Sequence, residues 1–219
     1  MNLLILGGTG RTGRLVVEEA LAAGHDVTAL VRSPEKLAVP SPRLRMVVGR
    51  ATDAADVARA MAGVDAVIST LGGGGSVILD STRAIVDAAR RTGVTRVVLM
   101  SSFLAEGDRF AAPARLLIKL TRGTTIDDKL AGEQLLRQSD LDWTIAYPSR
   151  LTDGPATGLV RVQAEGAKRR ITESISREDV ARWLVEAATS REAGRRGADI
   201  TGGLPVAGAA EVARVGGTR

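Results

Sequence analysis

The chain of 219 residues contains no cysteine and only one histidine. Without cysteine there is no disulfide, no thiolate nucleophile and no thiolate metal ligand. With His25 as the only imidazole, we expect neither a transition-metal site nor a Ser–His–Asp triad. His25 lies between a predicted helix end and a predicted strand start, and we interpret it as a turn residue.

Aromatic residues are also scarce, at 2% of the chain, whereas apolar residues make up 44%. The core must therefore be aliphatic, and there are few rings on which single-stranded nucleic acid could stack. No window is apolar enough to span a membrane, and the first apolar run is too short for a signal peptide. We therefore expect a cytoplasmic protein that does not partner a membrane.

The balance of charge is positive, with a formal net charge of +5 and a pI of about 10.3. One interpretation of such a balance is a polyanionic partner. The basic residues are scattered, however, and form no single stripe. This favours a solvated surface and a phosphate-rich cofactor over nucleic-acid binding.

A glycine-rich turn follows the first apolar run and reads Gly7-Gly8-Thr9-Gly10-Arg11-Thr12-Gly13. It contains Gly-x-Gly-x-x-Gly from Gly8 and the looser Gly-x-x-Gly-x-x-Gly from Gly7. Glycines at these spacings allow a tight strand-to-helix turn, close approach of a pyrophosphate and close packing of the helix on the sheet. The helix that follows would direct free N–H groups and its positive dipole end at the phosphates. Because a strand precedes the turn and a helix follows it, the stretch predicts a dinucleotide site; the alternative is a glycine turn in some other α/β protein.

Strand-like and helix-like patterns alternate along the chain, which predicts an α/β fold with a doubly wound parallel sheet. We expect a single Rossmann-fold domain over residues 1–219, with strand order 3-2-1-4-5-6 or close to it. The ligand crevice should lie outside the carboxyl ends of the first and fourth strands, between the glycine loops 7–13 and 72–75. The predicted strands are 2–6, 26–31, 45–48, 66–70, 96–100, 142–147 and 198–201, with two further short strands at 158–163 and 170–174. The predicted helices are 11–23, 54–62, 76–91, 113–120, 126–138 and 177–188, with a short turn or helix at 33–37.

The residue after the second strand distinguishes the two nicotinamide cofactors. An NAD site usually has a carboxylate there, bonded to the ribose hydroxyls. This chain has Arg32, which can hold a 2′-phosphate through charge-assisted hydrogen bonds, and Ser33 could add a donor. The sequence therefore favours NADP(H) over NAD(H), and the alternative is that Arg32 is a solvated loop residue.

Several runs resemble one family. The glycine turn, Val31-Arg32-Ser33-Pro34, the run 62–69, the run 129–148 and the run 175–181 resemble the atypical short-chain dehydrogenase/reductases. Among these they are most similar to the NAD(P)H-binding NmrA-like and biliverdin reductase B (flavin reductase)-like proteins. The resemblance extends to about Gly203 and is specific for fold and nucleotide rather than for substrate.

The resemblance implies a set of cofactor contacts. Gly7, Gly10 and Gly13 would carry the pyrophosphate, helped by Thr9, Arg11 and Thr12. The other implied contacts are Arg32 at the 2′-phosphate, Asp53 near the adenine, Leu71 and Gly72 beside the nicotinamide ribose, Ser101 and Ser102 near the nicotinamide, and Pro148 and Ser149 at its carboxamide region. Further candidate cofactor contacts are Ser33, Arg50, Ala51 and Lys129. Relatives often have Gly-Asp where this chain has Gly49-Arg50; Arg50 could stack on adenine, join the phosphate pocket or be an exposed loop residue.

The catalytic pair of active relatives is incomplete here. Lys129 matches the lysine of Tyr-x-x-x-Lys, but Thr125 stands in the tyrosine position, and the loss of such a general acid costs roughly 10²–10⁴-fold in rate. The only tyrosine, Tyr147, is interpreted as part of the site wall. The remaining candidates for catalysis are Ser101, Ser102 and Lys129, and the serines could either orient a substrate carbonyl or simply end a strand.

These residues predict hydride transfer from NADPH to a small acceptor that needs little acid from the enzyme, such as a flavin or quinone. One alternative is a non-catalytic NADP(H)-binding redox sensor of the NmrA type. Another is an NAD(P)-dependent epimerase or dehydratase, against which Thr125 argues. We expect the substrate mouth to be formed by about 102–125 and 148–175. In it, Arg115, Lys119 and Arg122 share one helical face that either binds an anion or is solvated, and Arg150 and Arg161 are rival anion contacts. The oligomeric state stays open.

Overall fold

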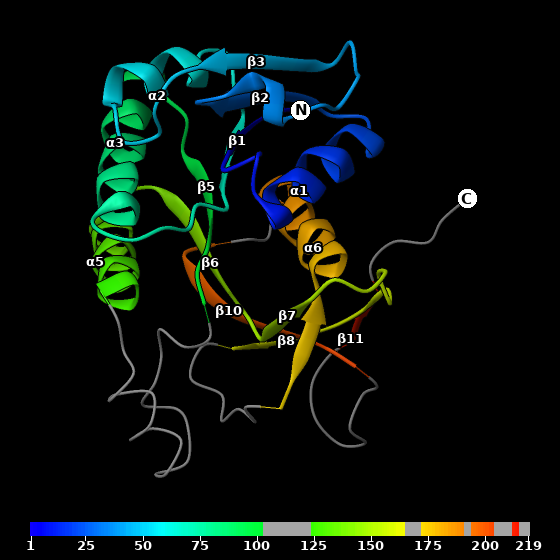
Figure 1. Cartoon of the computed structure of the whole chain (residues 1–219). Helices are drawn as coiled ribbons and strands as arrows, with labels where there is room; N and C mark the ends of the chain where they lie inside the picture. Colours follow the sequence, from blue (N-terminus) through cyan, green and yellow to red (C-terminus); the bar gives the residue numbers. More distant parts are fainter. Residues whose placement is uncertain (103–123, 165–171, 191–193, 204–211, 215–219) are drawn as a thin grey trace.

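The computed structural model describes residues 1–102, 124–164, 172–190, 194–203 and 212–214 (Figure 1). In this part of the chain a nine-stranded sheet has the order β11-β8-β10-β6-β5-β4-β1-β2-β3. From β3 to β10 every neighbouring pair is parallel, whereas β8 and β11 are added antiparallel at one edge. A separate two-stranded parallel sheet joins β7 to β9.

The strands have these bounds: β1 Asn2–Leu6, β2 Asp26–Val31, β3 Leu44–Val48, β4 Ala66–Ser69, β5 Arg96–Met100, β6 Asp142–Pro148, β7 Arg150–Thr152, β8 Leu159–Ala164, β9 Ser174–Ser176, β10 Arg196–Gly202 and β11 Val212–Arg214. The helices are α1 Arg11–Ala22, α2 Ala54–Met61, α3 Val77–Thr92, α5 Thr124–Gln138 and α6 Arg177–Thr189, with a short 3-10 helix at Pro34–Lys36.

The predicted fold class, a doubly wound parallel sheet, is confirmed. The strand order 3-2-1-4-5-6 is present and is extended by β10, β8 and β11. The chain reverses direction across the sheet between β1 and β4, which lie side by side with Leu3 paired to Ala66. This is the switch point at which a doubly wound sheet opens a crevice at the carboxyl ends of its strands.

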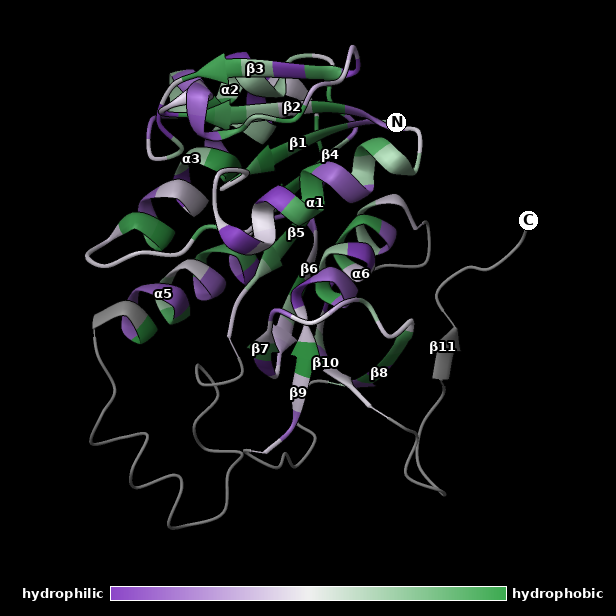
Figure 2. Cartoon of the chain, turned by 45° about the vertical axis from the view of Figure 1, so that its right-hand side comes forward, coloured by the Kyte–Doolittle hydropathy of each residue, from purple (hydrophilic) through white to green (hydrophobic). Residues whose placement is uncertain are grey.

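Two helical layers cover the sheet. Helices α1 and α6 lie on one face, and α2, α3 and α5 lie on the other (Figure 1). Strands β1, β2 and β5 are coloured mainly hydrophobic in Figure 2, whereas α1, α5 and α6 carry hydrophilic residues as well. Each face has its own aliphatic core, with Ile5 and Ile68 on the α1–α6 side and Leu4 and Val67 on the other, as the period-2 alternation of a strand requires.

Side-chain caps and glycines set several helix ends. Asp53 accepts hydrogen bonds from the backbone N–H groups of Ala55 and Asp56 at 2.8 and 3.0 Å, and so begins α2. Ser176 caps α6 through the N–H of Asp179 at 2.9 Å. Gly93 ends α3 with a φ of 76°, which a residue with a side chain rarely adopts.

Some predicted boundaries are wrong. The short strand expected at 170–174 is found at Ser174–Ser176, and residues 172 and 173 precede it. Strands β7 and β11 were not predicted, because three-residue pairings carry no periodicity of their own. The helix expected at 113–120 lies outside the described residues. None of the helices in the described ranges has the length and hydropathy to cross a membrane.

Candidate functional site

The glycine turn is shaped by close packing of β1 and α1 against the end of β4. Gly7 has a φ of 85°, and a Cβ on it would lie 2.9 Å from Oγ1 of Thr70. A Cβ on Gly13 would lie 2.6 Å from the same oxygen and 2.7 Å from the carbonyl carbon of Gly7. The N–H of Gly10 donates to the carbonyl of Gly7 at 2.9 Å. Both ends of the turn therefore require glycine for steric reasons.

The first turn of α1 is left open for an anion. Its N-cap residue is Gly10, which has no side chain to accept from the free N–H groups, and the first turn contains no acidic residue. Unsatisfied N–H groups and the positive end of the helix dipole are the elements that bind phosphates. The glycine turn therefore fits the pyrophosphate that the sequence predicted for it.

A cavity of about 440 Å³ lies at the carboxyl ends of β1 to β4. It is lined by Gly7, Thr9, Leu30, Val31, Arg32, Gly49, Arg50, Ala51, Thr52, Leu71, Gly72, Gly73 and Val77. Seven predicted cofactor residues are among these: Gly7, Thr9, Arg32, Arg50, Ala51, Leu71 and Gly72. None of the described residues that line the cavity carries a carboxylate.

Arg32 and Arg50 give the cavity its charge. Both side chains are exposed, and neither guanidinium makes a hydrogen bond or ion pair with another described residue. They come from neighbouring parts of the cavity edge, Arg32 directly after β2 and Arg50 two residues after β3. The cavity can therefore offer two cationic donors to an anionic group.

Asp56 holds the Arg50 loop in place, a role that the sequence does not indicate. Its carboxylate accepts from the backbone N–H of Arg50 at 2.8 Å and from the guanidinium of Arg59 at 2.7 Å. These bonds lower the pKa of Asp56 below its ordinary value. A Cβ on Gly49 would lie 2.7 Å from the carboxyl carbon of Asp56, so the absence of a side chain at Gly49 leaves room for the Asp56 carboxylate.

Other predicted cofactor residues have different partners. Asp53 caps α2 and does not line the cavity. Ser33 is the N-cap residue of the 3-10 helix, without a side-chain cap bond, and also lies outside the lining. Arg11 forms an ion pair with Asp153, which also pairs with Arg177. These contacts tie the start of α1 to the start of α6.

The remaining residues of the glycine turn and of the β6 end are placed as follows. Thr12 is buried at the start of α1. Pro148 ends β6 in register with Ile200 of β10. Ser149 is buried, and its hydroxyl donates to Oγ1 of Thr201 at 3.1 Å. The side chain of Ser149 is thus directed at β10, and its predicted carboxamide contact stays a prediction.

A buried polar cluster lies at the carboxyl end of β5. Ser101 continues from β5, with its N–H donating to the carbonyl of Ala146 at 2.8 Å, and its hydroxyl donates to Oε1 of Glu133 on α5. Oε2 of Glu133 accepts from the hydroxyl of Tyr147 at 2.5 Å. Glu133 is only 4% exposed and Tyr147 is fully buried. The sequence alone does not indicate a role for Glu133, although it stands one helical turn after Lys129.

Lys129 lies on the same helix as Glu133. Burial lowers the pKa of its ammonium, and the nearby carboxylates of Glu133 and Asp128 act in the opposite direction. The side chain of Thr125, the residue in the tyrosine position, lies outside the described residues, as do Arg115, Lys119 and Arg122. Ser102 is half-buried beside Ser101.

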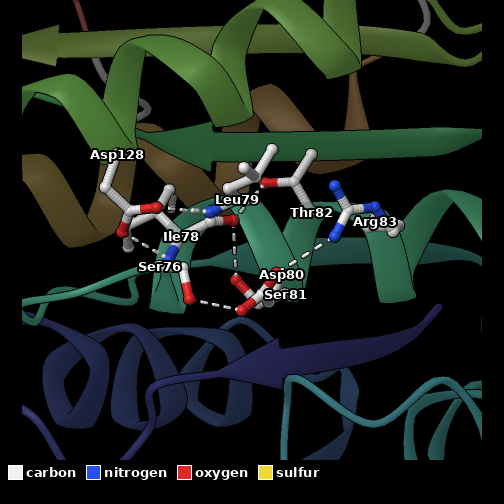
Figure 3. Close-up of polar contacts among 8 residues, drawn as sticks. All are labelled: Ser76, Ile78, Leu79, Asp80, Ser81, Thr82, Arg83 and Asp128. Atoms are coloured by element: carbon white, nitrogen blue, oxygen red, sulfur yellow. Dashed lines mark hydrogen bonds and ion pairs between the residues drawn. The ribbon is translucent and has the colours of Figure 1, made fainter.

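Asp128 has a structural task that the sequence did not reveal. It reaches from α5 to the start of α3, where its carboxylate accepts from the N–H groups of Ile78 and Leu79 at 2.8 and 2.9 Å (Figure 3). The two helices pack closely here, since a Cβ on Gly132 would lie 3.0 Å from Ile78. This contact fixes α5, and with it Lys129 and Glu133, relative to the glycine loop 72–75 before α3.

Comparison with known proteins defines the family. The family model described as NAD(P)H-binding matches residues 7–191, from the glycine turn to just beyond α6. This chain belongs to the NAD(P)H-binding family. The match includes the whole cavity lining and the Ser101–Glu133 cluster, and the family resemblance seen in the sequence is confirmed.

Three relatives illustrate the breadth of the family. An uncharacterized chloroplastic protein of Arabidopsis thaliana is 33% identical over 207 residues, covering 87% of this chain and 73% of its own. The uncharacterized sugar epimerase YhfK of Bacillus subtilis is 28% identical over 219 residues, covering 94% and 97%. Among solved structures, the anaerobillin reductase ChuY of Escherichia coli O157:H7 is similar with a TM-score of 0.74 and 26% identity, covering 91% of this chain and 96% of that one.

The described residues fit a nicotinamide dinucleotide. The glycine turn and the open start of α1 suit a pyrophosphate, and the cavity beside them is lined by apolar and cationic groups. Among the residues that the structure describes, no group of three or more His, Asp or Glu side chains is arranged to hold a metal ion.

Proposed function

We propose that this protein is an NADPH-dependent oxidoreductase that transfers a hydride to a small acceptor such as a flavin or a quinone. The observation that carries the proposal is the cavity at the ends of β1 to β4, whose described lining has Arg32 and Arg50 and no carboxylate. A 2′-phosphate is stabilised by such a pair of guanidinium groups, and a carboxylate in that place would repel it. The anaerobillin reductase among the solved relatives supports a reductase.

The residues of this chain would bind and orient the dinucleotide. The glycine turn and the start of α1 would hold the pyrophosphate, Arg32 and Arg50 the 2′-phosphate, and Leu71 and Gly72 the far side of the crevice. When bound, NADPH supplies the hydride. The protein contributes the fixed positions that make the transfer effectively intramolecular.

The choice of acceptor follows from the proton supply. Tyr147 is fully buried and its hydroxyl is bonded to Glu133, so it is not placed to act as an acid for a substrate. Ordinary ketone reduction needs such an acid in the transition state. Reduced flavins and quinols take protons from water, so an acceptor of this kind suits the site.

The test is anaerobic mixing of the pure protein with NADPH and, in separate experiments, FMN, riboflavin or a simple quinone. Nicotinamide absorbance is followed against samples without protein, and NADH is measured in parallel. We expect saturable oxidation that is faster with NADPH than with NADH.

Two other results would have clear meanings. Tight binding of NADPH without oxidation by any acceptor would contradict the reductase and favour the redox-sensor alternative. Oxidation at equal rates with NADH and NADPH would keep the reductase and contradict the assigned role of Arg32 and Arg50.

A further inference from the structure

Glu133 is the centre of a buried hydrogen-bond chain that links three elements of the fold. Its two carboxylate oxygens accept from two different hydroxyls, Ser101 at the end of β5 and Tyr147 near the end of β6. The Tyr147 hydroxyl in turn accepts from the guanidinium of Arg137 at 2.8 Å. Buried polar groups are costly unless they are paired, and here each carboxylate oxygen has a donor.

Two cations of α5 lie one helical turn from Glu133, and Arg137 bonds to the cluster. Arg137 lies one turn after Glu133 on α5, and its guanidinium carbon is 5.0 Å from the centre of the Trp143 ring. Lys129 lies one turn before Glu133, close enough for the carboxylate to act on its pKa. The orientation of the carboxylate is thus set by its two hydroxyl donors, and one of these, Tyr147, is held in turn by Arg137.

This arrangement decides what Ser101 can offer to a ligand. A serine hydroxyl has one proton and two lone pairs. The proton of Ser101 is directed at Glu133, so only lone pairs are left for any other neighbour. Toward a ligand, Ser101 is therefore a hydrogen-bond acceptor and cannot orient a carbonyl, which needs a donor.

We infer that Ser101 accepts a hydrogen bond from an amide-type or imide-type N–H group at the hydride-transfer end of the site, and that Glu133 is the positioning residue that sets this role. The inference rests on the proposed function: β5 lies next to β4 in the sheet, so a nicotinamide beyond Leu71 and Gly72 would lie at the end of β5. Two ligand groups have the required chemistry: the carboxamide of the nicotinamide and the imide of a flavin. A simple quinone has neither.

The test removes the N–H group from each candidate ligand in turn. In the binding arm, the Kd of NADPH is compared with that of its reduced 3-acetylpyridine analogue, in which a methyl ketone replaces the carboxamide. In the turnover arm, kcat/KM for riboflavin is compared with that for N3-methylriboflavin. In at least one arm we expect the wild-type protein to prefer the N–H ligand about three- to tenfold, the range for one hydrogen bond.

Four variants of the full chain separate the roles. Ser101→Ala should bring the preference close to one, because it removes the accepting oxygen, and Ser101→Thr should restore it. Tyr147→Phe is the matched control: it removes the other donor to the carboxylate, leaves the Ser101 contact, and should keep the preference. Glu133→Gln should reduce the preference, because a neutral amide offers one accepting oxygen to two hydroxyls.

Several outcomes would overturn the inference. A wild-type preference near one in both arms would do so, as would a Ser101→Ala variant that discriminates as well as the wild type. A Glu133→Gln variant that keeps the full preference would contradict the positioning role of Glu133. If that variant does not fold, the comparison of Ser101→Ala with Tyr147→Phe still tests the role of Ser101. Absence of turnover with every acceptor would contradict the proposed function instead, and the binding arm would still test Ser101.

Discussion

Gly13 has the least room of the residues in the glycine turn. An added Cβ would lie 2.6 Å from the Thr70 hydroxyl oxygen and 2.7 Å from the Gly7 carbonyl carbon, and both neighbours belong to packed elements. We expect Gly13→Ala to destabilise the fold by about 1–3 kcal/mol, the usual cost of overpacking. The melting temperature should fall by about 3–10 °C.

The control for this substitution is Gly74→Ala. A Cβ on Gly74 meets nothing within 4 Å, and its φ is not in the left-handed region. Its stability should stay within about 0.5 kcal/mol of the wild type. Equal melting temperatures for Gly13→Ala and Gly74→Ala would contradict the steric requirement for glycine at position 13.

Arg32 is the residue on which the choice of cofactor depends most directly. Its guanidinium lines the cavity and is bonded to no other described residue. We expect Arg32→Ala to weaken NADPH binding about tenfold or more, from about 1.5–3 kcal/mol for a charged hydrogen bond, and to leave NADH binding nearly unchanged. Arg90→Ala, on the exposed side of α3, is the control for a general change of charge. Titration with both nucleotides is the measurement, and equal weakening of the two would refute the assignment.

Helices α3 and α5 depend on each other through Asp128. Its buried carboxylate accepts from two N–H groups at the start of α3 that no residue of that helix caps (Figure 3). We expect Asp128→Ala to lower the free energy of unfolding by about 1–2 kcal/mol, as for a lost helix cap. Asp140→Ala, at an exposed position just beyond α5, should have little effect. Urea denaturation of the three proteins measures both, and indistinguishable midpoints would contradict the cap.

Asp179 connects the start of α6 to the loop before β8. Burial alone would raise its pKa, but hydrogen bonds from Thr157, Ser176 and Gly158 outweigh burial and hold the pKa below its ordinary value of 3.8. A depressed pKa in the folded state stabilises the protein above the unfolded value, and this stabilisation is lost as the pH falls through the folded value.

Replacement by asparagine should therefore show a pH dependence. Asp179→Asn should be less stable than the wild type at pH 7, and the difference should shrink as the pH falls below 3.8. Denaturation at a series of pH values measures this. A difference that stays constant down to the acid limit would mean that the ionised carboxylate is not what holds the loop.

The elements that the sequence predicted well are those with local signals. The starts of α2 and α6 were predicted from Asp53 and Ser176, and the end of α3 from Gly93, because caps and stops act within one turn of the chain. The bounds of β1, β2 and β5 were predicted without error. Strand β9 was misplaced because its pairing with β7, about 24 residues earlier in the chain, has no local pattern.

For the candidate site, too, only the residues with a local sequence signal could be predicted. The glycine turn and Arg32 stand beside recognisable strand ends, so their place in the cavity followed from the sequence. Glu133 and Asp128 could not be assigned, since their partners lie on other elements, 32 and about 50 residues away. The sequence of a helix shows only that a carboxylate is present, and the tertiary fold determines which groups it contacts.

The fold brings the cationic cavity and the buried polar cluster to one edge of the sheet. The cationic cavity lies at the ends of β1 to β4, and the Ser101–Glu133–Tyr147 cluster lies at the ends of β5 and β6. Because these strands are parallel and adjacent in the order β6-β5-β4-β1-β2-β3, their carboxyl ends form one continuous edge. An extended dinucleotide laid along this edge would have its adenosine phosphate at Arg32 and its nicotinamide near Ser101.

The most direct test of this arrangement is an experimental structure of the complex with NADP⁺. We expect the pyrophosphate at the glycine turn 7–13, the 2′-phosphate within about 3 Å of guanidinium nitrogens of Arg32 or Arg50, and the nicotinamide at the end of β5. A 2′-phosphate directed into solvent, away from both arginines, would contradict the assigned choice of cofactor. A dinucleotide bound away from the glycine turn would contradict both the proposed site and the proposed function.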